Sequence, residues 1–232
     1  NIIIRSDSLG SFTDNVDALP LKEATEDAYE LALSFHQGTE VERDYQEAEK
    51  YYKEALTYGE HPKSLVGLGR IYLNGNGVAP DFALASELFH RAVAEDPENA
   101  DANFHLGDLY LRGLSVPRRD LKRAVGFFKT AASNGNAAAA LRLSELYEYG
   151  IGVPKSLKKA RYWLNEAARL PVAKNDDGSS RYASYLAKEI LENPTYDMAP
   201  LKGSERGSGR VIALLIAVEE YQELGDLNTP IS

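Results

Sequence analysis

The sequence contains no cysteine, which excludes disulfide bonds, zinc sites with thiolate ligands and thiol nucleophiles within the chain. Long apolar runs are also missing: the longest, Val211 to Val218, is far shorter than the roughly 20 residues of a membrane-crossing helix. No HExxH pattern surrounds the four histidines, and the glycine-rich segment NGNGV lacks the Lys-Ser/Thr ending of a phosphate-binding loop. The sequence therefore predicts no membrane span, no cofactor, no metal site and no catalytic constellation.

Charge is distributed unevenly along the chain. Residues 1–60 carry 14 acidic and 5 basic side chains, whereas residues 115–170 carry 4 acidic and 11 basic ones. The basic segment, with Arg118, Arg119 and the pairs 122–123 and 158–159, is either a solvated helix face or a site for an acidic partner. Nucleic acid is disfavoured as that partner, because the net charge is -9 and no aromatic residues interleave with the basic ones.

Six columns of residues recur in register four times along the chain, and the leucine column repeats at intervals of 37, 38 and 37 residues. Each copy has a leucine, an aromatic residue four positions later, a glycine, a valine and two alanines seven positions apart. The columns are Leu31, Leu68, Leu106, Leu143; Phe35, Tyr72, Tyr110, Tyr147; Gly38, Gly75, Gly113, Gly150; Val41, Val78, Val116, Val153; Ala48, Ala85, Ala124, Ala160; and Ala55, Ala92, Ala131, Ala167. This regularity predicts stacked repeats.

Each copy is predicted to form two helices. The leucine and the aromatic residue share one face of the first helix, and the glycine ends that helix in the left-handed conformation. The second helix is expected to begin at a capping side chain, and Asp44 with Glu47 is expected to form a capping box. The small alanine stripe allows close helix packing, and Tyr72, Tyr110 and Tyr147 are predicted to be buried between helices.

The repeat resembles the Sel1-like repeats, relatives of the tetratricopeptide repeat with a longer connection between helices. The matching features are Leu68-Gly69, Leu106-Gly107, the Gly-x-Gly-Val turns 75–78 and 150–153, and the paired alanines. The resemblance covers residues 24–170, as copies 24–59, 60–98, 99–135 and 136–170. It implies an all-α, right-handed α-solenoid of four helix-turn-helix repeats that acts as an adaptor or scaffold, with a partner in its concave face.

A variable stripe on the first helices is the predicted recognition surface. Positions -1, +2 and +6 from the leucine column lie on one helical face and differ between copies, so they form either a partner site or a plain solvated groove. The candidate partner-binding residues are Arg70, Asn74, His105, Asp108, Arg112, Arg142, Glu145 and Tyr149. The three arginines are predicted to form a row that binds an acidic or carboxylate-bearing protein or peptide.

Both ends of the chain differ from the repeat. Residues 1–23 are expected to be an irregular lead-in, residues 171–193 a loop and a capping helix, residues 194–209 a linker, and residues 210–232 a strand-like apolar tail. The tail resembles the opening of caspase-like peptidase domains, with Arg210, the aliphatic run to Val218, Tyr221 and the segment 227–230. That resemblance implies that a catalytic domain would lie further on.

Two functions therefore remain open at the level of sequence. The first is a non-enzymatic scaffold that binds a protein partner. The alternative is the N-terminal regulatory or substrate-recognition part of a caspase-like protease, with the peptidase domain joined through residues 210–218.

Overall fold

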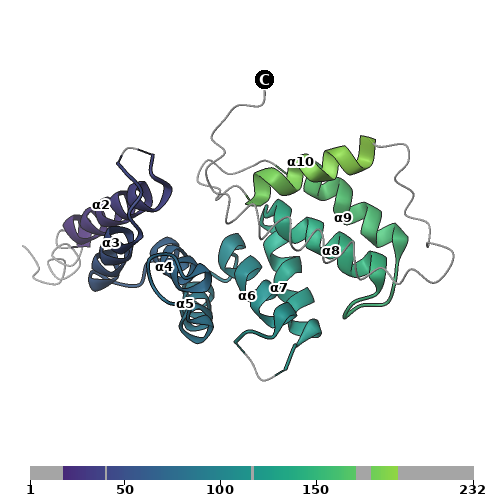
Figure 1. Ribbon diagram of the computed structural model, residues 1–232, viewed down its shortest axis with the longest axis horizontal. Helices are drawn as coiled ribbons and strands as arrows, with labels where there is room; N and C mark the ends of the chain where they lie inside the picture. Colours follow the sequence, from purple (N-terminus) through teal and green to yellow (C-terminus); the bar gives the residue numbers. More distant parts are fainter. Residues whose placement is uncertain (1–17, 40, 116–117, 171–178, 193–232) are drawn as a thin grey trace, which may run out of the picture. The chain divides into compact units, whose positions relative to one another are not determined.

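The computed structural model describes residues 18–39, 41–115, 118–170 and 179–192, and these residues form α-helices and connecting turns without strands (Figure 1). The chain divides into two compact units, Asn1–Ala102 and Asn103–Ser232. The predicted all-α solenoid class is confirmed. The predicted linker at 194–209 and the tail at 210–232 lie outside the described residues, as does most of the lead-in.

The first unit consists of two helical hairpins. Its helices are α2 (Ala18–Gln37), α3 (Tyr45–Thr57), α4 (Pro62–Asn74) and α5 (Phe82–Glu95). Helix α2 packs along α3, α4 packs along α5, and α3 joins the hairpins by packing against α4 (Figure 1). Helix α2 begins at Ala18, before the repeat boundary expected at residue 24, and Pro20 in its first turn is compatible with a helix because those amides need no intrahelical acceptor.

The second unit contains two further hairpins and a final helix. Its helices are α6 (Ala100–Arg112, whose first residues belong to the first unit), α7 (Leu121–Ser133), α8 (Ala137–Tyr149), α9 (Leu157–Arg169) and α10 (Ser179–Glu192). Helix α8 packs along α9 and against α7, and α10 packs on α8 and α9 (Figure 1). The helix predicted after the fourth repeat is thus present, and it covers both helices of that repeat.

The turn between the two helices of a repeat has the predicted chemistry. Gly75 and Gly150 end α4 and α8 with φ of 70° and 73°, a left-handed conformation that favours glycine. The side chains of Asp44, Asp81, Asp120 and Ser156 each accept hydrogen bonds from amides in the first turn of the next helix. The positions of the turn and of both helix ends therefore follow from the sequence.

The backbone amide of each capping residue makes a further hydrogen bond that ties the two helices together. It donates to the carbonyl of the aromatic column residue, with N to O distances of 3.0 Å for Asp44 to Phe35, 2.9 Å for Asp81 to Tyr72, 3.1 Å for Asp120 to Tyr110 and 2.8 Å for Ser156 to Tyr147. The predicted capping box at Asp44 is wrong in its second half: Phe35 accepts from the Asp44 amide, and Glu47 pairs with Lys50 at 2.8 Å.

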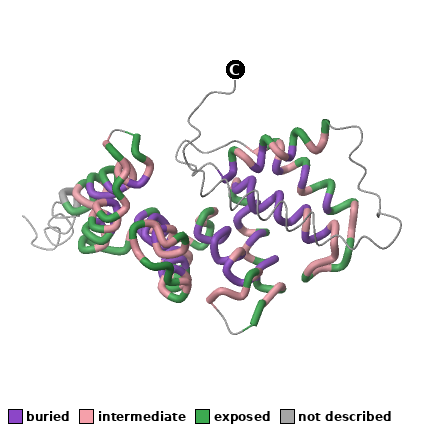
Figure 2. The backbone as a smooth tube through the Cα atoms, viewed as in Figure 1, coloured by how far each residue is buried: buried purple, intermediate pink, exposed green. Residues whose placement is uncertain are grey.

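The core consists of the alanine columns and large side chains packed against glycine. All eight alanines of the two columns are fully buried, as are Tyr52, Phe89 and Phe128. Figure 2 shows the buried residues of the described helices in purple. A Cβ atom at Gly69 would lie 2.6 Å from the Phe89 ring, and one at Gly107 would lie 2.7 Å from the Phe128 ring. Glycine in the Leu-Gly pair is therefore required by the close approach of the second helix.

The leucine and aromatic columns are not equally buried in all four repeats, and one prediction needs correction. Tyr110 and Tyr147 are buried as predicted, but Tyr72 is only half-buried. Leu31 has 37 % of its surface exposed, whereas Leu106 is fully buried. Leu31 lies on α2, and among the described residues of the first unit no earlier helix covers that face.

Replacing Tyr110 by alanine is expected to lower the free energy of unfolding by about 3 kcal/mol, because the buried ring stacks on Phe127 at 5.5 Å. The same change at the half-buried Tyr72 should cost clearly less. Urea unfolding followed by circular dichroism measures both. Equal losses at the two positions would show that burial does not set the contribution of this column.

Candidate functional site

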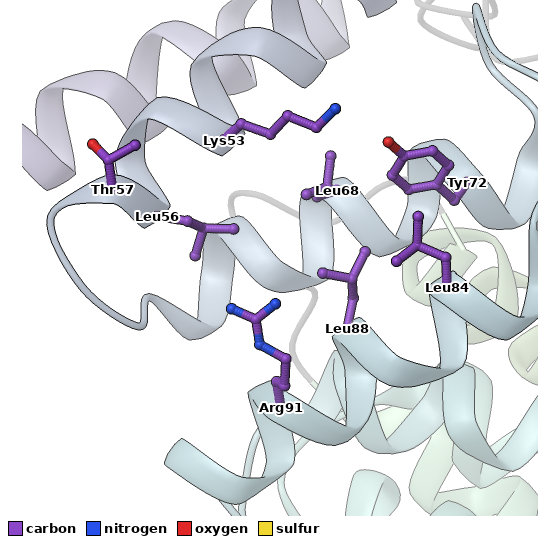
Figure 3. Close-up of a pocket in the computed structure, with 8 residues that line it drawn as sticks. All are labelled: Lys53, Leu56, Thr57, Leu68, Tyr72, Leu84, Leu88 and Arg91. Atoms are coloured by element: carbon purple, nitrogen blue, oxygen red, sulfur yellow. The ribbon is translucent and has the colours of Figure 1, made fainter.

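A groove of about 280 Å³ opens between α3, α4 and α5 in the first unit (Figure 3). Helix α4 forms its floor with Leu68 and Tyr72. Helices α3 and α5, which are the second helices of the first and second repeats, form its walls. The lining residues are Lys53, Leu56, Thr57, Leu68, Tyr72, Leu84, Leu88 and Arg91. We refer to this feature as the α3–α5 groove.

The α3–α5 groove has an aliphatic interior and a charged rim. Leu68 and Leu88 are almost completely buried, while Leu56 and Leu84 are half-buried and border the opening. Figure 3 shows these four leucines lying between Lys53 on α3 and Arg91 on α5. Such a surface suits an aliphatic side chain from a partner.

Each rim cation is held by a carboxylate of the same unit. The Lys53 ammonium lies 2.5 Å from Glu49, and the Arg91 guanidinium lies 2.7 Å from Glu60. Tyr72 donates its hydroxyl to Glu49 at 2.6 Å. Burial opposes ionisation of Glu49, but hydrogen bonds from Lys53 and Tyr72 outweigh it and lower the pKa of this carboxyl. The groove thus has cations in defined positions at its edge.

The α3–α5 groove exists because the second repeat departs from the others at two positions. Just before the first alanine of the second helix, the other repeats carry the charged residues Glu47, Arg123 and Lys159, whereas the second carries Leu84. Three residues after that alanine, the others carry the aromatic residues Tyr51, Phe127 and Trp163, whereas the second carries Leu88. Sequence analysis missed the groove, although these two columns contain the signal.

In each of the other repeats at least one of these positions covers the aromatic column, as Tyr51 does by stacking on Phe35. The Arg123 guanidinium lies 5.5 Å from the centre of the Tyr110 ring, and the Lys159 ammonium lies 5.2 Å from that of Tyr147. Phe127 stacks on Tyr110. In the second repeat the Lys53 ammonium, from α3, lies 5.9 Å from the centre of the Tyr72 ring, and Leu84 and Leu88 leave the groove open beside it.

The predicted first-helix stripe becomes more exposed from its first position to its last. At position -1, His105 and Arg142 are buried, and Gly67 is buried because the Tyr52 ring occupies the space of a Cβ. Position +2, with Arg70, Asp108 and Glu145, is intermediate. At position +6, Asn74 and Arg112 are exposed and Tyr149 is intermediate. In the second to fourth repeats, only the last position of the stripe therefore includes exposed residues.

Arg142 does not face an open groove, contrary to the prediction for the arginine row. Its guanidinium lies 3.1 Å from Glu145, and the side chains are only 7 % and 12 % exposed. Phe104 on α6 and Ala183 on α10 border the same pair. Burial raises the pKa of Glu145, and the charge of Arg142 opposes that rise. The carboxylate predicted to come from a partner is here supplied by the chain itself.

The other two arginines of the predicted row also interact with residues of their own units. The Arg112 guanidinium lies 3.2 Å from Asp108 on the same helix. The charge of Arg70 acts on Tyr29, whose pKa burial raises to about 12 while Arg70 opposes that rise. Arg70 belongs to the first unit, whereas Arg112 and Arg142 belong to the second. Each unit therefore presents its part of the stripe separately.

A hydrogen-bonded series of Ser64, His61 and Glu26 resembles a catalytic arrangement at first sight. The Ser64 hydroxyl is 2.7 Å from His61 Nδ1, and His61 Nε2 is 3.3 Å from Glu26. Ser64 is completely buried, so a substrate cannot reach it. The described residues also contain no group of three His, Asp or Glu side chains placed to hold a metal ion, and no helix among them is long and apolar enough to cross a membrane.

The Sel1 repeat family model matches residues 25–57, 62–96, 100–136 and 137–172, more than half of the chain. The chain belongs to the Sel1 repeat family. Sel1 repeats mediate protein–protein interactions and are themselves non-enzymatic. The match ends at residue 172, so the caspase-like resemblance of the tail remains a prediction.

Named relatives of this Sel1 repeat chain have regulatory and biosynthetic roles. Chitin synthase regulatory factors 3 and 1 of Schizosaccharomyces pombe are 28 % and 34 % identical over 70 % and 57 % of the chain. Alginate biosynthesis protein AlgK of Azotobacter vinelandii is 37 % identical over 40 % of the chain. The matched regions cover 18 %, 28 % and 19 % of these relatives, so the chain spans less than a third of their length.

Solved structures show the same fold. A Sel1 repeat protein from Oxalobacter formigenes is 24 % identical, with a TM-score of 0.57 over 72 % of this chain and 74 % of that one. A protective antigen of uropathogenic Escherichia coli strains with an SLR fold is 23 % identical, with a TM-score of 0.55 over 89 % of this chain and 40 % of that one.

Proposed function

We propose that this Sel1 repeat chain is a scaffold that binds a partner protein in the α3–α5 groove. The observation that supports this proposal is an open aliphatic groove at the repeat that carries Leu84 and Leu88 where the others carry a charged and an aromatic residue. Folding stability alone would favour the covered arrangement, since the covering side chains remove apolar surface from water. An open groove is therefore better explained by binding.

The groove suits a partner segment with an aliphatic anchor next to a carboxylate. The anchor would bury its side chain against Leu68, Leu84 and Leu88, and this burial would supply most of the affinity. A flanking carboxylate would lie near Arg91, where it would compete with Glu60 for the guanidinium and set the orientation of the segment. A protein partner with acidic character is thus retained as part of the proposal.

The first-helix stripe remains a second candidate surface, because Asn74 and Arg112 are exposed at position +6. It lies on the other side of α4 from the groove: at 100° per residue, Arg70 is about 160° around the helix axis from both Leu68 and Tyr72. Variants can therefore test the two surfaces of the first unit separately.

Filling the groove is expected to weaken partner binding more than tenfold while the chain stays folded. The variant Leu84→Lys/Leu88→Phe places a basic residue and a phenylalanine in the second repeat, at the positions where the third repeat carries Arg123 and Phe127. Peptides selected from a random library on the immobilised chain serve as probes. Isothermal titration calorimetry measures their affinity for both proteins, and thermal unfolding confirms that the variant is folded.

The matched control is Asn74→Lys, which adds the same charge on the opposite side of α4. Its affinity for the selected peptides should equal that of the unmodified chain. Loss of binding in this control, with full binding by the groove-filled variant, would place the interface on the stripe and contradict the proposal for the groove.

A further inference from the structure

A second surface, on the second unit, is strongly basic. The loop between α8 and α9 packs against the start of α7, since a Cβ atom at Gly152 would lie 2.7 Å from Leu121 Cβ. This contact brings the beginnings of α7 and α9 to the same edge of the unit. The exposed cations there are Arg118, Arg119, Lys122, Arg123, Lys155, Lys158 and Lys159. We call this set the basic edge.

Few carboxylates neutralise the basic edge. Asp120 caps α7 and lies 3.3 Å from Arg123, and neither α7 nor α9 has an acidic residue in its first turn. No hydrogen bond or ion pair joins the side chains of Arg118, Lys122, Lys155 and Lys158 to any residue that the structure describes. Most of the positive charge at this edge is therefore available to a ligand.

Two of these cations stand where they disfavour folding. Lys122 lies in the first turn of α7 and Lys158 in the first turn of α9, whereas Arg123 and Lys159 in the same turns lie over the rings of Tyr110 and Tyr147. A helix N-terminus carries partial positive charge, so cations in the first turn are unfavourable and acidic residues are preferred there. Stability does not explain this arrangement, and the mutual repulsion of the cations adds to its cost.

We propose that the basic edge binds an acidic segment of a partner protein, at a site separate from the α3–α5 groove. The ligand would be rich in aspartate or glutamate, and its carboxylates would pair with the lysines and arginines at the starts of α7 and α9. A nucleic acid fits less well, because the net charge of the chain is -9, which opposes the approach of a polyanion. Tyr110 and Tyr147 already lie under Arg123 and Lys159 rather than being free to stack on bases.

The test uses the full chain and a fluorescein-labelled peptide of alternating glutamate and glycine. Fluorescence anisotropy should show binding in low-salt buffer that weakens as salt approaches about 150 mM, where the screening length is about 8 Å. The variant Lys122→Gln/Lys155→Gln/Lys158→Gln should bind the peptide at least tenfold more weakly. Its melting temperature should be unchanged or higher, because first-turn cations have been removed.

The control variant Lys129→Gln/Arg169→Gln/Lys188→Gln removes the same charge away from the basic edge and should bind as the unmodified chain does. Equal losses in the two variants would show a general charge effect and overturn the proposal. Tighter binding of a single-stranded oligonucleotide of equal charge, lost in the first variant, would also overturn it and assign the edge to nucleic acid. A fall in melting temperature with unchanged peptide binding would identify the lysines as structural.

Discussion

Replacing Phe128 by alanine is expected to lower the free energy of unfolding by about 4 kcal/mol. The ring is fully buried on α7 and fills the space left by Gly107 on α6. It also lies 6.0 Å from the Phe104 ring. Gly107 has no side chain, so removal of the Phe128 ring would leave a cavity between α6 and α7. This cavity cannot close unless one of the two helices moves.

The neighbouring Phe127 provides the matched control for this prediction. It is half-buried and stacks on Tyr110, so Phe127→Ala should cost less than half as much as Phe128→Ala. Urea unfolding measures the difference in unfolding free energy, provided that the m-value is the same for both variants. A loss below about 1.5 kcal/mol for Phe128→Ala would mean that the repeat repacks and that the glycine column does not depend on this ring.

Breaking the Arg142–Glu145 pair from one side is expected to be similarly costly. The variant Arg142→Leu leaves the Glu145 carboxylate at 12 % exposure without its cation, and such changes at buried pairs cost about 4 kcal/mol. Replacing both residues by leucine removes the unpaired charge together with its partner. The double variant should therefore recover most of the lost stability, which thermal and urea unfolding of the three variants would show as a strong coupling.

The pH dependence of Arg142→Leu has a definite sign. Burial raises the pKa of Glu145 in the folded chain, and loss of the Arg142 charge should raise it further. A carboxyl with a raised folded-state pKa holds its proton more tightly when folded, so its stabilising contribution is present at low pH and is lost as pH rises through that pKa. The deficit of Arg142→Leu relative to the double variant should therefore grow with pH. A constant deficit would show that Glu145 remains charged without Arg142.

Periodicity in the sequence was sufficient to predict the repeat and most of its local structure. The features that were predicted correctly act within one helix, one turn or one hairpin, so their spacing alone predicts the conformation. They are the glycines at 75 and 150, the capping residues and the alanine columns. The helix after the fourth repeat was predictable for the same reason. The capping box at Asp44 failed because its amide donates to Phe35, in the preceding helix.

The surfaces depended on packing between helices, which spacing within one helix does not reveal. The three stripe positions share one face of the first helix and were therefore predicted to be equally open. Arg142 is nevertheless buried, because α6, α8 and α10 meet around it. The α3–α5 groove required three helices to be placed before the effect of Leu84 and Leu88 became visible. Local hydrogen bonds and backbone preferences, which depend on neighbouring residues, are thus enough to predict the repeat, its turns and its caps. Which side chains remain open to a partner depends on burial by helices that are far apart in the chain and that meet only in the folded molecule.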